Sequence, residues 1–221
     1  MKFKPIIIIA GEPNSIFSEI FLKVVRKKKY RSPVILICSK KIFLKQAKVL
    51  KKNIKFNELD IKNISLNNLK LKKLNLINID YDQSKAFQKI SAKSNKYISK
   101  CFDTGLKLIR TGISNKLING PISKKYFLKN KFNGITEYLA HKTKSKDFAM
   151  VIYNKKLSVC PITTHLPIKM VAKKIKKKLL FEKISLINNF YKNNRGFKPK
   201  IAILGLNPHC ESIHKFNEDE K

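Results

Sequence analysis

The sequence has few acidic side chains and very few arginines. Its 221 residues include 49 lysines and arginines but only 14 aspartates and glutamates, for a formal net charge of +35. Only four of these cations are arginine, the residue best suited to phosphates and base edges. Lysines scattered among abundant Ile and Asn favour a solvated surface, so we expect no nucleic-acid partner. The alternative is a polyanion-binding protein, whose affinity would fall steeply as salt rises.

Cysteines and long apolar runs are also scarce. Cys38, Cys101, Cys160 and Cys210 form no C-x-x-C pair, which argues against a disulfide framework and a zinc knuckle. No apolar run approaches the roughly 18 residues that cross a bilayer, and the N-terminal run is too short for a signal peptide. We therefore expect a cytoplasmic protein with reduced thiols and no membrane contact.

The pattern that is present alternates strands with helices. Residues 6–10 form a continuous apolar run that begins with four isoleucines, as expected of a strand buried on both faces. Asn14 or Ser15 can cap a helix to Val25, and a strand at 34–38 and a helix at 41–51 follow. The alternation predicts an α/β fold, a mostly parallel mixed sheet with helices on both faces.

The remaining chain continues this organisation without a clear internal linker. The pattern predicts short strands and loops at 52–80, a helix at 83–111, a strand at 116–119, an antiparallel strand pair at 148–153 and 157–163, helix at 168–193 and a last buried strand at 200–206.

Three predicted strands end in abrupt turns that carry polar side chains. They are followed by Gly11-Glu12-Pro13, by Gly120-Pro121-Ile122-Ser123-Lys124 and by Asn207-Pro208-His209. Ligands of open α/β sheets bind at the carboxyl ends of strands, so the three turns would face one crevice. The alternative is that they are ordinary chain turns.

Two of the four histidines, His165 and His209, lie at such predicted strand ends and could share a divalent ion. His141 and His214 are expected to be structural or surface residues. The sequence contains no nucleophile elbow, Walker loop, kinase motif or G-x-G-x-x-G fingerprint. Residues and spacing alone indicate a cytosolic α/β protein in which these two histidines are either metal ligands or satisfied structural residues.

The residue sequence of several motifs resembles that of the 4-hydroxythreonine-4-phosphate dehydrogenase family of pyridoxal phosphate synthesis. The resemblance covers the whole chain but only part of the family's length. It rests on these segments, in this order: Ile8-Ile9-Ala10-Gly11-Glu12-Pro13, Asn119-Gly120-Pro121-Ile122-Ser123-Lys124, Gly134-Ile135-Thr136-Glu137-Tyr138-Leu139-Ala140, Thr163-Thr164-His165-Leu166-Pro167 and Leu204-Gly205-Leu206-Asn207-Pro208-His209.

The resemblance implies NAD- or NADP-dependent oxidation, with decarboxylation, of a phosphorylated amino-acid substrate. It also implies a homodimer with the site at its interface, and a fold like that of isocitrate and isopropylmalate dehydrogenases. Residues 1–221 would then be the N-terminal portion of a two-lobed enzyme, incomplete at the C-terminus. The family's divalent metal, zinc first with Mg or Co as alternatives, is held by three histidines. His165 and His209 match two of these, and Thr136 matches a substrate contact. The third histidine and most cofactor-binding residues belong to the part of the family pattern that is absent.

Several positions depart from the family pattern. Ile135 stands where a substrate-contacting histidine is usual, Ser123 stands for Asn, and bulkier residues replace small ones at 14–17. The departures leave open a related substrate such as 4-phosphothreonate, or an inactive fragment. If His165 and His209 are ligands, we expect their imidazole nitrogens to lie within about 6–7 Å of each other, beside Gly120 and within reach of Thr136.

Overall fold

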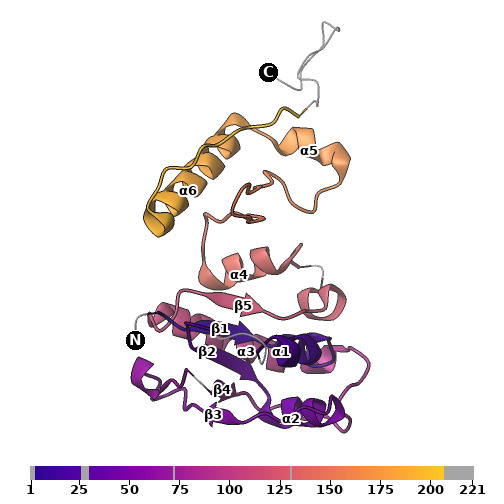
Figure 1. Cartoon of the computed structure of the whole chain (residues 1–221). Coiled ribbons are helices and arrows are strands. Elements are labelled where there is room, and N and C mark those ends of the chain that lie inside the picture. Colours follow the sequence, from indigo (N-terminus) through magenta and orange to yellow (C-terminus); the bar gives the residue numbers. More distant parts are fainter. Residues whose placement is uncertain (1–2, 26–29, 72, 130, 207–221) are drawn as a thin grey trace, which may run out of the picture. The chain divides into compact units, whose positions relative to one another are not determined.

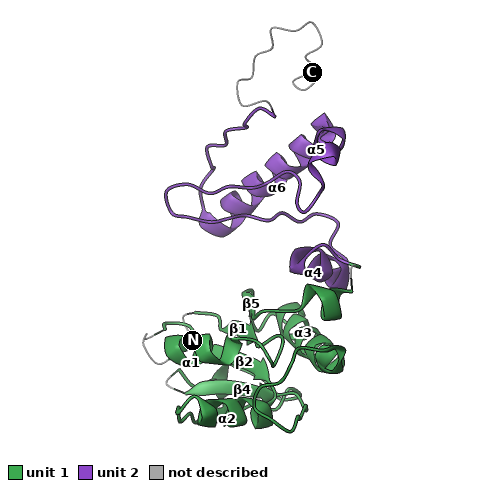
Figure 2. Ribbon diagram, turned by 90° about the vertical axis from the view of Figure 1, so that its right-hand side faces the viewer, with its two compact units in different colours: residues 1–131 green, residues 132–221 purple. Residues whose placement is uncertain are grey.

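The computed structural model describes residues 3–25, 30–71, 73–129 and 131–206 (Figure 1). The chain divides into two compact units, residues 1–131 and residues 132–221 (Figure 2). The two units differ in how much apolar surface they bury, and each is described by itself.

The first unit is built on a five-stranded parallel sheet with the strand order β3-β4-β2-β1-β5. The central strand β1 pairs through Ile8 with Leu36 of β2 and with Ile118 of β5. Because all described strands of the sheet run parallel, their carboxyl ends lie at one edge. The strands are β1 (Ile6–Ile9), β2 (Val34–Cys38), β3 (Phe56–Glu58), β4 (Leu74–Asn78) and β5 (Leu117–Asn119).

Helices cover both faces of this sheet (Figure 2). On one face α1 (Phe17–Val25) and α2 (Lys40–Val49) contribute Phe21 and Phe43 to a cluster that also contains Leu36 and Leu76 of the sheet. On the other face lies α3 (Asn95–Arg110), whose Gly105 permits close packing. A Cβ atom at that position would lie 2.9 Å from Ile9 Cδ1. The shorter elements are η1 (Leu66–Asn68), η2 (Ala92–Ser94) and the π-helical η3 (Lys124–Leu128).

The cysteines of the first unit belong to its core. Cys38 and Cys101 are both buried and reduced. Burial raises the pKa of Cys38 well above its usual value and raises the pKa of Cys101 to about 12. Since the thiolate is the nucleophile, neither side chain is suited to covalent chemistry near neutral pH.

The second unit buries much less of its apolar surface. It contains α4 (Ile135–Thr143), α5 (Ile168–Lys174) and α6 (Lys177–Arg195). Tyr138 and Ala140 of α4 are buried, whereas neither α5 nor α6 has a buried residue. The helices expected at 168–193 are therefore present, with a break between α5 and α6. None of the helices in the described ranges has the length and apolar character needed to cross a membrane.

Three predicted elements differ in the structure. The α/β class with helices on both faces is confirmed, but the described strands of the sheet are all parallel, and the expected antiparallel pair is reduced to one bridge between Ile152 and Val159. The predicted strand at 200–206 is wrong: this segment pairs with no described strand, and Leu204 is 88% exposed. The predicted helix at 83–111 is wrong in its first part, since helical structure begins at Ala92.

Candidate functional site

Two of the three predicted turns meet at the carboxyl edge of the sheet. The N–H of Gly120 donates to the carbonyl oxygen of Ile9 at 2.7 Å, and the N–H of Glu12 donates to that of Pro121 at 2.8 Å. Gly11 adopts a φ of +76°, and a Cβ atom there would lie 2.4 Å from the Pro121 oxygen. The two glycines therefore let the turns after β1 and β5 pack backbone against backbone. The third predicted turn, at residues 207–209, lies outside the described residues.

Both carboxylate oxygens of Glu12 accept hydrogen bonds from neighbouring polar groups. Its side chain is buried, and its Oε2 accepts a hydrogen bond from Ser94 Oγ at 2.7 Å. Its Oε1 accepts from the backbone N–H and from the side-chain amide of Asn14, at 3.1 and 3.3 Å. Glu12 therefore holds this edge of the sheet together, which is a structural role.

Asn14 is hydrogen-bonded to the segment that follows β4. Its Oδ1 accepts from the Gln83 side-chain amide and from the Gln88 backbone N–H, each at 2.8 Å. The same segment is held by Ser39 Oγ, which donates to the Tyr81 carbonyl at 2.6 Å, and by Gln46 Nε2, which donates to that of Ala86 at 3.0 Å. These contacts explain why the segment is ordered without being helical.

Charges around this segment reinforce its attachment. Hydrogen bonds from Lys41 and Lys45 hold the pKa of Asp82 well below its usual range. Burial, with a smaller contribution from the negative charge of Glu12, raises the pKa of Tyr81. Both pKa shifts arise from contacts between this segment and the rest of the first unit.

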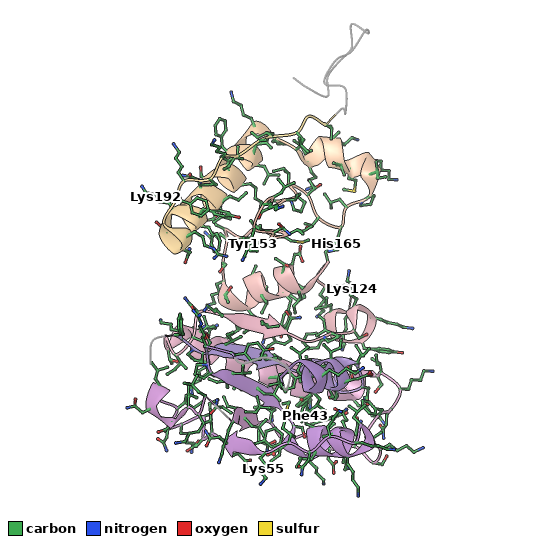
Figure 3. The ribbon with its side chains drawn as sticks, viewed as in Figure 1. Phe43, Lys55, Lys124, Tyr153, His165 and Lys192 are labelled. Carbon is green, nitrogen blue, oxygen red and sulfur yellow. The ribbon has the colours of Figure 1, made fainter. Side chains whose placement is uncertain are left out.

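In the second unit, the predicted ligand His165 lies on the loop that precedes α5 (Figure 3). It does not end a strand, contrary to the prediction, because the preceding residues form only the single bridge at Val159. Its side chain is exposed, and its φ is +55°, in the left-handed region that residues other than glycine rarely adopt. Lys51, Lys129 and Lys144 also have a positive φ, so this conformation does not by itself mark a functional site.

The start of α4 lies against this loop. Thr164 Oγ1 donates to Glu137 Oε1 at 3.2 Å, and Glu137 Oε2 is buried without a hydrogen-bond partner in the described part of the chain. A Cβ atom on Gly134 would lie 3.1 Å from Glu137 Oε2 and 3.6 Å from His165 Nε2. The missing side chain of Gly134 thus leaves a space that both polar atoms border.

The remaining predicted site residues divide into those near this space and those that lie elsewhere. Ile135 and Thr136 are in the first turn of α4, directly after Gly134, and both are half-buried. His209 lies outside the described residues, so its expected approach to His165 stays a prediction. Within the described ranges, no three His, Cys, Asp or Glu side chains are grouped as a metal site.

Sequence reasoning did not single out Glu137 or Thr164 as site residues, although both belong to quoted motifs. They are separated by 27 positions, and their contact depends on a tertiary approach that no local pattern encodes. Glu137 is an acidic residue in the first turn of α4, and such residues commonly stabilise helix N-termini without any further role.

Comparison with known proteins identifies relatives over nearly the whole chain. The family model described as pyridoxal phosphate biosynthetic protein PdxA matches residues 29–221. The 4-hydroxythreonine-4-phosphate dehydrogenase of Sulfurihydrogenibium sp. is 36% identical over 97% of this chain and 66% of the relative. The D-threonate 4-phosphate dehydrogenase of Salmonella typhimurium is 25% identical over 100% of this chain and 68% of the relative. The chain thus spans about two thirds of the length of these relatives.

Solved structures show the same fold. The 4-hydroxythreonine-4-phosphate dehydrogenase of Klebsiella pneumoniae matches 94% of this chain and 65% of its own with a TM-score of 0.81 at 23% identity. The corresponding protein of Burkholderia phymatum matches 94% of this chain and 64% of its own with a TM-score of 0.78 at 21% identity. At these identities the likeness establishes the fold.

Proposed function

We propose a function for this chain from the premise that it belongs to the family of pyridoxal phosphate biosynthetic protein PdxA, whose model matches residues 29–221. The proposed reaction is the NAD- or NADP-dependent and divalent-metal-dependent oxidation, with decarboxylation, of 4-hydroxythreonine 4-phosphate. The observation that carries the proposal is the 36% identity, over 97% of this chain, to a relative of that name. A cytoplasmic homodimer with the site at its interface is part of the same proposal.

The residues near His165 fit a divalent cation. The imidazole is exposed, and beside it the buried Oε2 of Glu137 lacks a partner in the described part of the chain. The space at Gly134 is one that a Cβ atom would fill. Imidazole nitrogen is a donor that zinc accepts, and the negative charge of a carboxylate nearby favours a cation. His165 and His209 would hold the ion, with zinc as the first candidate and Mg or Co as alternatives.

Protein groups in the proposed reaction bind and orient the substrate. The Thr136 hydroxyl can hydrogen-bond a substrate oxygen, whereas the neighbouring Ile135 can only offer apolar contact. When bound, the ion supplies stabilisation of negative charge on the hydroxyl oxygen, and the nicotinamide cofactor supplies the hydride acceptor. No described residue is assigned to the cofactor.

The metal proposal predicts a weak site that both histidines are needed to form. Two protein ligands leave an ion mostly hydrated, since catalytic zinc sites usually have three. His165→Ala or His209→Ala should weaken Co²⁺ binding by at least about 100-fold, because even loss of an outer-shell partner costs about 10–100-fold. Titration followed by the visible cobalt spectrum measures this loss. His141→Ala is the matched control, since His141 packs on the Phe132 ring. Unchanged binding in both ligand variants would contradict the assignment.

A second candidate substrate is 4-phosphothreonate, which Ile135 favours because a histidine is usual there. The 25% identity to a D-threonate 4-phosphate dehydrogenase supports keeping this alternative. If Ile135 sets the preference, Ile135→His should change the relative affinity for the two phosphorylated compounds by up to about tenfold, the worth of one hydrogen bond. Calorimetric titration of both compounds measures the ratio, with Ile135→Leu as the control. If Ile135→His leaves the ratio of the two affinities unchanged, the reason for this alternative is removed.

A further inference from the structure

The loop that carries His165 is anchored to α4 by one side-chain contact. Thr164, the residue directly before His165, donates its hydroxyl to Glu137 Oε1 at 3.2 Å. The next residue then takes the left-handed φ of +55°. A residue with a Cβ atom keeps such a conformation only when its surroundings hold it there. The Thr164–Glu137 contact is a restraint of this kind.

The second oxygen of Glu137 faces the imidazole side of the same space. Oε2 is buried and, within the described ranges, has no hydrogen-bond partner. A buried carboxylate oxygen without a partner is costly, so a donor is expected close to it. The Cβ position built at Gly134 is 3.1 Å from this oxygen and 3.6 Å from His165 Nε2. His165 Nε2 borders the same space and is a donor that rotation of the two side chains would bring to Oε2.

We propose that Glu137 is the positioning residue for His165. Its Oε1 accepts the Thr164 hydroxyl. In the proposed arrangement a side-chain rotation brings the Nε2 proton of the imidazole to Oε2, which leaves Nδ1 as the nitrogen available to a ligand. Histidines that bind metals commonly donate their other N–H to a carboxylate, which fixes the tautomer and the ring orientation. The inference rests on the proposed function for the identity of the ligand, but the orientation of the ring does not depend on that ligand.

Gly134 has a defined part in this arrangement. A side chain at this position would enter the space between the carboxylate and the ring, at distances tighter than ordinary contact on the carboxylate side. Its φ of −163° is extended backbone that any residue can adopt. Gly134→Ala should therefore act through the space that the new methyl group fills, separating Glu137 from His165 without straining the backbone.

The experiment measures ring order in the metal-free protein and Co²⁺ affinity in parallel. Carbon-13 relaxation of the His165 imidazole should show a more mobile ring in Glu137→Gln and in Thr164→Val than in the wild type. Co²⁺ affinity should fall by about 10–100-fold in Glu137→Gln. Thr164→Ser, which keeps the hydroxyl, should retain the ring order and the Co²⁺ affinity of the wild type, and Glu182→Gln, on exposed α6, should change neither.

The outcomes separate this inference from the proposed function. A wild-type protein that binds no Co²⁺ but loses ring order in Glu137→Gln would contradict the metal proposal and support the positioning role. An unchanged ring order in both Glu137→Gln and Thr164→Val would overturn the positioning role whatever the metal affinity. If Glu137→Gln fails to fold, the pair Thr164→Val and Thr164→Ser decides the matter, since both keep the carboxylate.

Discussion

Gly11→Ala is expected to destabilise the protein by about 3–4 kcal/mol, whereas Gly112→Ala should cost only about 1 kcal/mol. Because both glycines have a φ of +76°, the backbone strain of an alanine should be the same at position 11 as at position 112. They differ in their surroundings. A Cβ atom at 11 would lie 2.4 Å from the Pro121 oxygen, and a Cβ atom at 112 would meet nothing within 4 Å. The difference between the variants therefore isolates the close approach of the two turns.

Urea unfolding followed by circular dichroism measures both variants. Steric relief cannot come from a side-chain rotation, because the atom met at position 11 belongs to the backbone. A loss of this size is a large fraction of the roughly 5–15 kcal/mol that stabilises a typical domain. Equal losses in the two variants would mean that the turns after β1 and β5 do not pack as described.

The strands nearest the chain start were predictable because their signals are local. The uninterrupted apolar run of β1, the run of β2 and the helical spacing of α1 each mark an element without reference to the rest of the chain. The Ser15 hydroxyl accepts the Phe17 N–H at 3.3 Å, as the capping prediction requires. These elements were therefore found with nearly correct bounds.

Strand β4 was harder to locate because a polar residue interrupts its apolar run. Asn75 is fully buried, which its sequence neighbours do not suggest. Its amide donates to the carbonyl oxygens of Val34 and Lys70, each at 3.0 Å, and its oxygen accepts from Asn57 at 2.9 Å. A satisfied buried amide depends on partners from other strands, so it could not be read from the local pattern.

The candidate site likewise contains some features that local motifs mark and others that depend on tertiary contacts. His165, Thr136 and the glycine turns could be named from motifs, and the two turns that the structure describes lie together. The attachment of residues 83–91 could not be predicted from local motifs, because it depends on hydrogen bonds to Asn14 and Gln46, which are distant in the sequence. The segment at 200–206 has the composition of a strand, but strand formation also needs a neighbouring strand, and the described part of the second unit provides none for it.

We propose that this chain carries the metal- and substrate-binding portion of a 4-hydroxythreonine-4-phosphate dehydrogenase. Two protein ligands make a weak metal site, so the 221-residue chain by itself should show little or no dehydrogenase activity. Joining it to the part of the Sulfurihydrogenibium relative that it does not cover should give an active enzyme, since the chain matches 66% of that relative. In this chimera, loss of a metal ligand should lower kcat/KM by at least about 100-fold, because the ion supplies several kcal/mol of charge stabilisation.

The most direct measurement is NADH formation from 4-hydroxythreonine 4-phosphate by this chimera, with and without His165→Ala. The account predicts turnover that requires NAD and a divalent cation, is abolished by a chelator and falls at least about 100-fold in His165→Ala, while His141→Ala stays near the parent rate. A folded chimera that does not oxidise the substrate, or one in which His165→Ala retains the parent rate, would contradict it.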